Sequence, residues 1–350
     1  MGVYYGLILW IGIVALLSLA IRNIETKNKF IIILSSLGII LVQSLRSPSV
    51  GVDVIGYLIG YELIESIDVF SNDKLFNYEI GYMIYSLIFA KLNFSNQIYI
   101  TVIVLSIIIP VAYTLYKNSK NLSISIFIYI TLGFFAFSFS GLRQMIAIAI
   151  VFYSFKYIKE RKIIKFLLFI FLGWTFHISA IIFIFAYPLY FIKLKLRHFI
   201  MIIPLFIIIY LLRSSIFLRI YQIYKGEEGE VVITNAYTML LVMILIYLLS
   251  YVFGSVKNVN LNLNAYRNYL LISIFIQIFA SQSNIAMRAG YYYYIFVTLL
   301  IPEVIKNQKD PKIRIISVYM LIAALLYFFS ITVGSGQMNI TPYNFFWNDN

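Results

Sequence analysis

The chain has 350 residues, of which 62% are hydrophobic and only 12% are charged, whereas about 25% of the residues of a soluble domain are charged. A water-soluble globular fold is therefore excluded for most of the chain, and the absence of cysteine excludes disulfides, thiolate metal sites and cysteine nucleophiles. The net charge of +13 does not require a nucleic acid partner, because a polytopic membrane protein keeps lysine and arginine on its cytoplasmic side.

Apolar segments follow one another along the whole chain. A helix that spans a bilayer needs about 20 predominantly apolar residues. Segments of about this length or shorter predict spanning helices near 3–21, 30–45, 97–116, 122–140, 142–158, 163–176, 178–192, 199–212, 236–254, 267–281, 289–305 and 313–333. The first segment has neither a basic region before it nor a cleavage pattern after it, so we expect a retained helix rather than a signal peptide.

Basic clusters at 22–29, 156–165, 193–197 and 306–314 determine the expected orientation, because Lys and Arg favour the cytoplasmic side. A crossing at 80–91 would place the second cluster outside, and this stretch is too short to span comfortably, so we expect a re-entrant or interfacial helix there. The sequence therefore predicts an all-α, polytopic transmembrane helical bundle with about 12 spanning helices. We expect a single integral membrane domain over 1–350, with outer loops at about 46–79 and 213–235 and an extracytoplasmic tail at 334–350.

Three arginines stand at the outer ends of expected helices: Arg46 follows one helix, and Arg143 and Arg288 each begin another. The helix dipole opposes an arginine in the first turn, so this arrangement suits a site that binds an anion such as phosphate. The alternative is an arginine that extends toward lipid headgroups. For Arg143, the neighbouring Gln144 and the small residues that follow favour a binding site.

His177 lies at the break between two short apolar segments whose other ends are basic, so it is expected at or near the outer surface. An ionisable group at this position is a candidate for function, and histidine can accept a proton from a sugar hydroxyl. The alternative is a structural histidine that is bonded to a neighbouring carbonyl.

The outer loop 46–79 offers Asp53, Tyr57 and Glu79 as sugar ligands or orienting groups, whereas its other acidic residues are expected to be solvated. We interpret the run Tyr291–Tyr294 as an interfacial aromatic belt rather than a platform for stacking sugars, and the tail TPYNFFW allows both interpretations. The chain has no P-loop, GxGxxG, GxSxG, HExxH or DxD-type metal motif, and with only two histidines a metal site is not expected.

Six motifs appear in the order and spacing of a known family. They are RSPSVGVDVIGY from residue 46, YEIGY from 78, GLRQMIAIAI from 141, FHISA from 176, MRAGYYY from 287 and TPYNFF from 341. With them, the chain from about residue 46 to its end resembles the EpsG family of Wzy-like polysaccharide polymerases. A GT-C-like arrangement of helices is compatible with this resemblance.

The resemblance implies a role in making bacterial O-antigen, capsule or exopolysaccharide, in the inner (cytoplasmic) membrane. Such polymerases join repeat units carried on undecaprenyl pyrophosphate, which bears both donor and acceptor, at the extracytoplasmic face. No metal or other cofactor is implied, and partners are the lipid-linked glycan, membrane lipid and a chain-length regulator. The family's arginine–glutamine pair falls on Arg143 and Gln144, its histidine on His177, its late arginine on Arg288 and its acidic residue on Asp53.

The leaving lipid pyrophosphate needs positive charge and the attacking sugar hydroxyl needs a base. The expected catalytic residues are His177 and Asp53, and the expected binding residues are Arg143, Gln144, Arg288, Arg46, Tyr57 and Glu79. Two other classes remain open: a flippase for lipid-linked oligosaccharides, which would show internal repeats and charges inside its helices, and a membrane O-acyltransferase.

Overall fold

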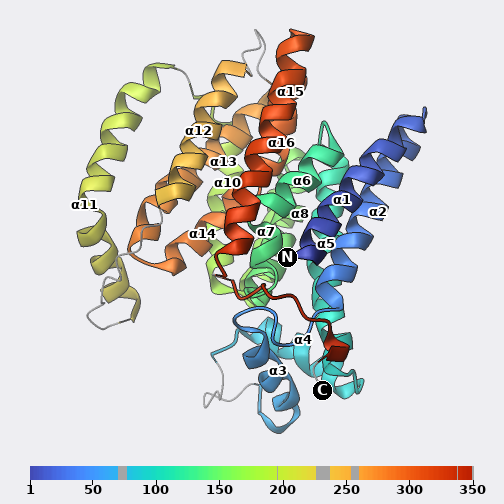
Figure 1. Cartoon of the computed structure of the whole chain (residues 1–350). Coiled ribbons are helices and arrows are strands. Elements are labelled where there is room, and N and C mark those ends of the chain that lie inside the picture. The colour runs from blue at the N-terminus through green and yellow to red at the C-terminus, as the bar shows by residue number, and fades with distance from the viewer. Residues whose placement is uncertain (70–76, 195, 226–236, 254–259, 337, 349–350) are drawn as a thin grey trace. The chain divides into compact units, whose positions relative to one another are not determined.

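The computed structural model (Figure 1) describes residues 1–69, 77–194, 196–225, 237–253, 260–336 and 338–348. Within these ranges the chain is helical, with one isolated antiparallel bridge between Arg46 and Phe345. The chain divides into two compact units, Met1–Ile181 with Ile315–Asn350 and Ile182–Arg314. The all-α class is thus confirmed, whereas the single integral membrane domain stays a prediction.

The first unit contains α1 (Gly2–Leu17), η1 (Ser18–Ala20), α2 (Ile24–Ser44), α3 (Val54–Glu62), η2 (Ile64–Ser66), α4 (Ile80–Lys91), α5 (Asn96–Asn118), α6 (Leu122–Thr131), α7 (Phe134–Phe137), α8 (Leu142–Lys159), α9 (Ile163–Phe176), most of α16 (Pro311–Gly334) and η6 (Phe346–Asn348). Among the described helices, four are long and apolar enough to cross a membrane: α1 continued by η1, α5, α16, and α11 (Phe199–Lys225) of the second unit. The count of about 12 crossings is not confirmed.

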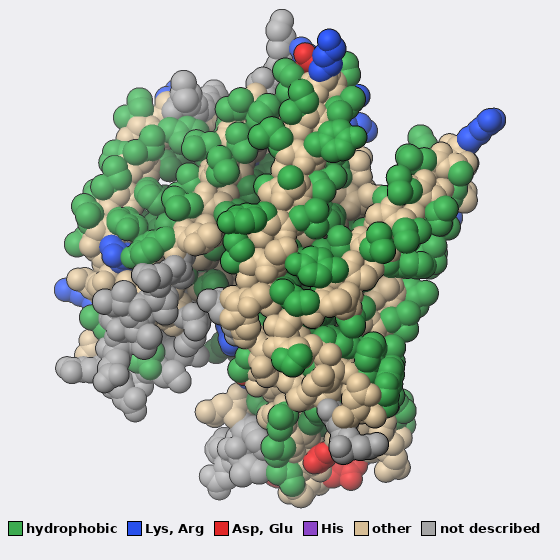
Figure 2. Space-filling model, in the orientation of Figure 1, with side chains coloured by type: hydrophobic (Ala, Val, Ile, Leu, Met, Phe, Trp, Pro, Cys, Tyr) green, Lys and Arg blue, Asp and Glu red, His purple; other side chains and the backbone are tan. Residues whose placement is uncertain are grey.

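The basic clusters of the first unit gather at one end. α2 packs on α5, α5 on α8 and α8 on α9. Lys159 Nζ donates to Asn118 Oδ1 over 2.8 Å, and Lys117 is close enough to Glu25 to act on it electrostatically. In Figure 2 the Lys and Arg side chains of the α1–α2 turn lie at the end opposite to acidic side chains of the outer loop. The basic clusters 22–29 and 156–165 therefore lie at the same end of the first unit.

The opposite end of the first unit gathers the start of α8, the end of α9 and both chain termini. Gln97 at the start of α5 donates to the Ser44 carbonyl at the end of α2. Tyr4 OH, in the first turn of α1, donates to Ile340 O of the C-terminal segment over 2.5 Å. This arrangement agrees with both termini on one side, and which side of a membrane it faces stays a prediction.

The loop after α2 lies against the segment that precedes α8. Gly51 has a φ of +112°, and a Cβ there would lie 2.4 Å from Phe139 O, so this turn requires glycine. The Val52 N–H donates to Ser140 Oγ over 3.0 Å. These contacts fix the start of α3 beside the start of α8.

α3, η2 and α4 form a small layer at this end of the first unit (Figure 1). Ile64, Val69 and Met83 are its buried core. α4 has 12 residues, so it is about 18 Å long at 1.5 Å per residue and is short of a hydrocarbon core of about 30 Å. Its expected re-entrant or interfacial position remains untested.

The second unit contains the remaining helices: the second half of η3 (Ile178–Phe185), α10 (Ala186–Phe191), η4 (Leu196–His198), α11, α12 (Tyr237–Phe253), α13 (Leu261–Gln277), η5 (Ile278–Ser281), α14 (Asn284–Tyr294) and α15 (Val297–Asn307). The interpretation of Tyr291–Tyr294 as an interfacial belt is wrong, because all four side chains are buried. Tyr293 OH, for example, donates to Ile182 O over 2.6 Å. The aromatic run is part of the core of this unit.

Several predicted segments differ from the observed helices. The segment 122–140 is broken at Gly133, whose φ of +94° ends one helix and begins α7. The segments 178–192 and 289–305 are likewise each divided, into η3 and α10 and into α14 and α15. The segment 199–212 is longer than predicted, because α11 continues to Lys225. The helix continues because residues 213–225 contain no glycine or proline. The first part of the expected outer loop 213–235 is therefore helical, and 226–236 lie outside the described residues.

Candidate functional site

Arg143 lies in the first turn of α8, and a tight turn places it there. At Gly141, just before the helix, a Cβ would lie 2.4 Å from the Phe137 ring, so the absence of a side chain lets α8 begin directly beside α7. The dipole of α8 opposes a positive charge at this position. The guanidinium therefore needs partners from other elements.

Glu79 is the carboxylate partner of Arg143. Arg143 Nη1 forms an ion pair with Glu79 Oε2 and donates to Asn77 O over 3.2 Å, while Nε donates to Tyr57 OH over 3.5 Å. The side chains of Arg143 and Glu79 are only 16% and 21% exposed, so water screens this pair less than it screens a surface pair. The pair connects the start of α8 to the residue that precedes α4.

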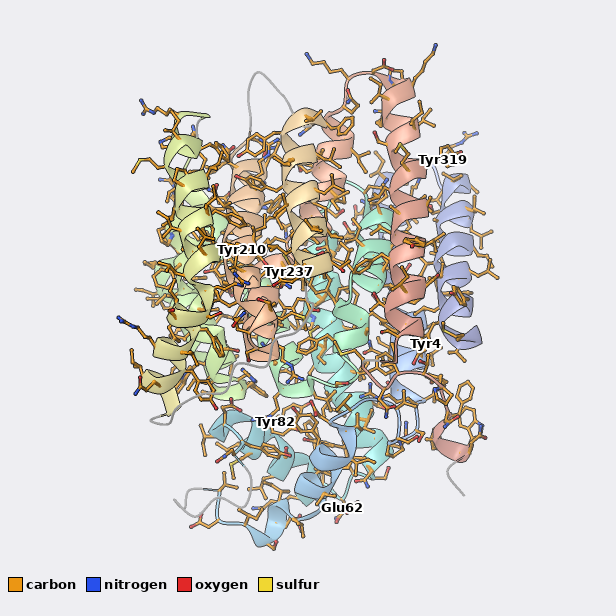
Figure 3. The ribbon with its side chains drawn as sticks, turned by 60° about the vertical axis from the view of Figure 1, so that its left-hand side comes forward. Tyr4, Glu62, Tyr82, Tyr210, Tyr237 and Tyr319 are labelled. Carbon is orange, nitrogen blue, oxygen red and sulfur yellow. The ribbon has the colours of Figure 1, made fainter. Side chains whose placement is uncertain are left out.

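Three tyrosine rings surround the Arg143 guanidinium. Its Cζ atom lies 4.5 Å from the centroid of Tyr78, 5.7 Å from that of Tyr57 and 5.9 Å from that of Tyr82. Figure 3 shows Tyr82 where the small outer layer meets the longer helices. Burial raises the pKa of the Tyr78 hydroxyl to about 12, so this group stays protonated and donates to Gly56 O over 3.1 Å. The ring faces thus stabilise the cation without a second negative charge.

Glu79 also holds the backbone next to His177. Its Oε1 accepts the N–H of Ile178, the first residue of η3, over 3.0 Å. One carboxylate therefore contacts both the arginine of α8 and the turn that follows α9. A close approach of α4 to α9 supports this contact, because a Cβ on Gly81 would lie 2.3 Å from Thr175 Oγ1.

His177 and Gln144 meet through Ser179. Ser179 Oγ lies 2.7 Å from His177 Nδ1, the Ser179 N–H donates to the same Nδ1 over 3.3 Å, and Gln144 Nε2 donates to Ser179 Oγ over 3.4 Å. Depending on the tautomer, Nδ1 either accepts the Ser179 N–H, with the imidazole proton on Nε2, or carries the proton and donates it to Ser179 Oγ. The histidine is therefore held in one orientation by contacts from its own turn and from α8.

The structure thus brings five of the eight expected site residues into one cluster, which we call the Arg143–His177 site: Arg143, Gln144, His177, Glu79 and Tyr57. The site lies at the end of the first unit opposite to its basic clusters. An arginine, a carboxylate and an imidazole at this spacing can bind a polar substrate and move a proton. Their roles in a reaction stay predictions.

The other three expected site residues are Asp53, Arg46 and Arg288. Asp53 precedes α3, makes no capping hydrogen bond and acts electrostatically on Tyr78, so it lies at the edge of the site. Arg46 follows the end of α2, as expected, and its side chain is fully buried under the C-terminal segment. Arg288 lies within α14 of the second unit, and its position relative to Arg143 remains untested.

Sequence reasoning missed Tyr78, Tyr82 and Ser179, although all three lie inside the motifs YEIGY and FHISA. Tyrosine and serine alone do not signal a site, and only the fold shows that they contact Arg143 and His177. It also passed over two buried charges of the second unit. Arg267 on α13 donates to Ser250, and Glu303 on α15 accepts from Asn260 over 2.8 Å.

Comparison with protein-family models identifies the group to which this chain belongs. The model of the EpsG family matches residues 10–345, which is nearly the whole chain. The chain belongs to the EpsG family. Membership of the EpsG family indicates a polymerase-like function in polysaccharide biosynthesis at a membrane, and confirms the resemblance that the sequence motifs gave. No curated protein and no solved structure gives a significant match to it.

Proposed function

We propose that this EpsG-family protein is a glycosyltransferase-type polymerase that joins undecaprenyl-pyrophosphate-linked repeat units into surface polysaccharide. The observation that supports this most strongly is the Arg143–His177 site, in which Glu79 connects the arginine to the turn of the histidine. The site would face the extracytoplasmic side of the inner membrane, because the basic clusters lie at the other end of the same unit.

The reaction requires one bond to form and one to break. A hydroxyl at the non-reducing end of the acceptor unit attacks the anomeric carbon of the donor chain, forming the new glycosidic C–O bond. The C–O bond to the lipid pyrophosphate breaks, and the pyrophosphate leaves with the electron pair. The hydroxyl proton passes to a base, for which His177 and Asp53 are the candidates.

The Arg143–Glu79 pair suits a positioning role in this reaction. Glu79 already neutralises much of the Arg143 charge, so the pair recognises sugar hydroxyls with both donors and an acceptor rather than acting as a simple cation. The rings of Tyr78 and Tyr57 hold the guanidinium in place for this contact.

His177 can serve in either of two ways. With Nδ1 accepting the Ser179 N–H, Nε2 carries the proton and can donate to an oxyanion. In the other tautomer, Nδ1–H donates to Ser179 Oγ at 2.7 Å, and Nε2 can accept the proton of the sugar hydroxyl. The two roles predict different outcomes for a glutamine at this position.

Product sizing in a deletion strain tests the proposed function. We expect the polysaccharide ladder to collapse to a single repeat unit, and lipid-linked single repeats to accumulate at the outer face of the membrane. Re-expression of the chain should restore the ladder. Accumulation at the inner face would indicate a flippase instead, and an unchanged ladder that lacks only acyl groups would indicate an O-acyltransferase.

A further inference from the structure

Arg46 is a buried cation whose side chain lacks hydrogen-bond partners. It lies in the loop after α2 and is 0% exposed. None of its three guanidinium nitrogens, Nε, Nη1 and Nη2, forms a hydrogen bond within the part of the chain that the structure describes. The two nearby tyrosine hydroxyls donate elsewhere: Tyr4 OH to Ile340 O over 2.5 Å, and Tyr343 OH to Val42 O over 2.8 Å.

Such an arrangement is unfavourable in the absence of a further partner. Burial lowers the pKa of the Arg46 guanidinium to about 10, yet the group still carries its charge at neutral pH. The Phe139 ring, whose centroid lies 4.6 Å from Cζ, compensates part of the lost hydration. Five N–H donors nevertheless stay unsatisfied, and buried polar groups in proteins are almost always hydrogen-bonded. The guanidinium is thus prepared for an acceptor that carries several oxygens.

The C-terminal segment Asn339–Trp347, which we call the C-terminal strap, covers Arg46. Phe345 pairs with Arg46 in the isolated antiparallel bridge. A hydrogen bond lies on each side of this bridge: the Ser47 N–H donates to Asn344 O over 2.8 Å, and the Phe346 N–H donates to Leu45 O over 3.0 Å. Figure 1 shows this segment running from the end of α16 to the C-terminus along the same end of the first unit as α3 and α4.

The strap covers Arg46, so a ligand can reach the guanidinium only if the strap moves. It contains no α-helix, and its last aromatic residues Phe346 and Trp347 are 39% and 51% exposed. Terminal segments open locally at lower free-energy cost than core helices. Opening of the strap would expose Arg46 without unfolding the unit.

Resting on the proposed function, we infer that Arg46 is a phosphoryl-binding subsite that the C-terminal strap opens and closes, and that its ligand is a diphosphate such as that of the lipid-linked substrate. Arg143 is less suited to this ligand, because Glu79 already occupies it. The segment 139–143 connects Arg46 to the Arg143–His177 site, because the Arg46 guanidinium stacks over Phe139, four residues before Arg143 in the chain. The reacting sugar and its diphosphate would then contact two neighbouring arginines with separate roles.

Binding and unfolding measurements on the purified full-length chain test this inference. The probes are inorganic pyrophosphate and a prenyl diphosphate, and the variants are Arg46→Met and, as a control that removes an equally positive but exposed side chain, Arg22→Met. Without a probe, Arg46→Met should unfold at or above the temperature of the unmodified chain, because it removes a buried uncompensated charge. A diphosphate should raise the unfolding temperature of the unmodified chain and of Arg22→Met, and bind Arg46→Met at least about tenfold more weakly.

Hydrogen exchange separates the strap from the rest of the chain. A bound diphosphate should slow hydrogen exchange at the amides of Ser47, Gly51 and Phe346. The Ser47 and Gly51 amides donate to carbonyls of the strap, and the Phe346 amide of the strap donates to the Leu45 carbonyl. If both probes bind, the diphosphate group alone is sufficient for recognition. If only the prenyl diphosphate binds, the lipid chain is also required, and the ligand is the lipid diphosphate. A lower unfolding temperature of probe-free Arg46→Met, equal binding by that variant, or no binding of either probe would overturn the inference. None of these results depends on the polysaccharide ladder, so failure here and failure of the proposed function are distinguishable.

Discussion

Replacement of Arg143 with alanine is expected to reduce the product to single repeat units in a complemented deletion strain. The substitution removes three polar contacts, to Glu79, Asn77 and Tyr57, and the cation from among the tyrosine rings. It also leaves the Glu79 carboxylate without its charged partner in a setting that is only 21% exposed. Removal of one member of a buried pair lowers folding stability by about 3 kcal/mol or more. Separately, loss of a group that positions the substrate is expected to lower the polymerisation rate by about 100-fold.

Two further variants separate a folding defect from a functional one. Glu79→Gln keeps the shape of the pair and the ability to accept the Ile178 N–H, so the protein should remain in the membrane at normal abundance while polymer length falls. The charge-swapped double variant Arg143→Glu with Glu79→Arg should not restore polymer, because the cation would then lie on the wrong element and the Ile178 N–H would lose its acceptor. Long polymer of normal abundance from Arg143→Ala would remove this arginine from the mechanism.

Substitution of His177 should have the second largest effect, and its pattern identifies the role of the imidazole. His177→Ala removes both ring nitrogens and should abolish long polymer. His177→Gln retains an N–H donor but cannot take up a proton. If His177 is the general base, His177→Gln should therefore be as inactive as His177→Ala, with a rate loss of about 100-fold to 10,000-fold.

The comparison is made by initial rate on lipid-linked substrate in purified membranes, with equal amounts of each variant. Ser179→Ala serves as a matched control, because it removes the hydroxyl that lies 2.7 Å from Nδ1 but keeps the Ser179 N–H contact. A modest loss in Ser179→Ala is expected in either case. Activity of His177→Gln near that of the unmodified chain would exclude proton transfer by His177 and leave Asp53 as the base.

The sequence predicted the part of the fold that depends on composition and charge. Apolar length identified the helices, and the clusters 22–29 and 156–165 predicted the end of the first unit at which they meet. Breaks within apolar segments could not be predicted with the same accuracy. Gly133 and the turn between α14 and α15 interrupt runs whose hydropathy is continuous, and hydropathy does not report backbone conformation.

The candidate site was predictable in its charged residues but not in its connections. Arg143 and His177 were recognisable because ionisable residues are rare next to apolar helices. Glu79 was one of several acidic residues in an outer loop, and only the fold shows that it contacts both Arg143 and Ile178. Burial of Arg46 depends on the C-terminal strap, nearly 300 positions later in the chain, which no local pattern can indicate.

Labelling of single cysteines in intact cells tests the central claim, that the Arg143–His177 site faces outward and the opposite end faces the cytoplasm. The natural chain has no cysteine, so each variant reports one position. Asn77→Cys lies beside Arg143 and Lys162→Cys lies in the turn between α8 and α9, and both positions are exposed. A membrane-impermeant maleimide should label Asn77→Cys in intact spheroplasts and Lys162→Cys only after the membrane is opened. Labelling of Lys162→Cys from outside, with Asn77→Cys protected until the membrane is opened, would contradict the proposed orientation and leave the site without access to an extracytoplasmic substrate.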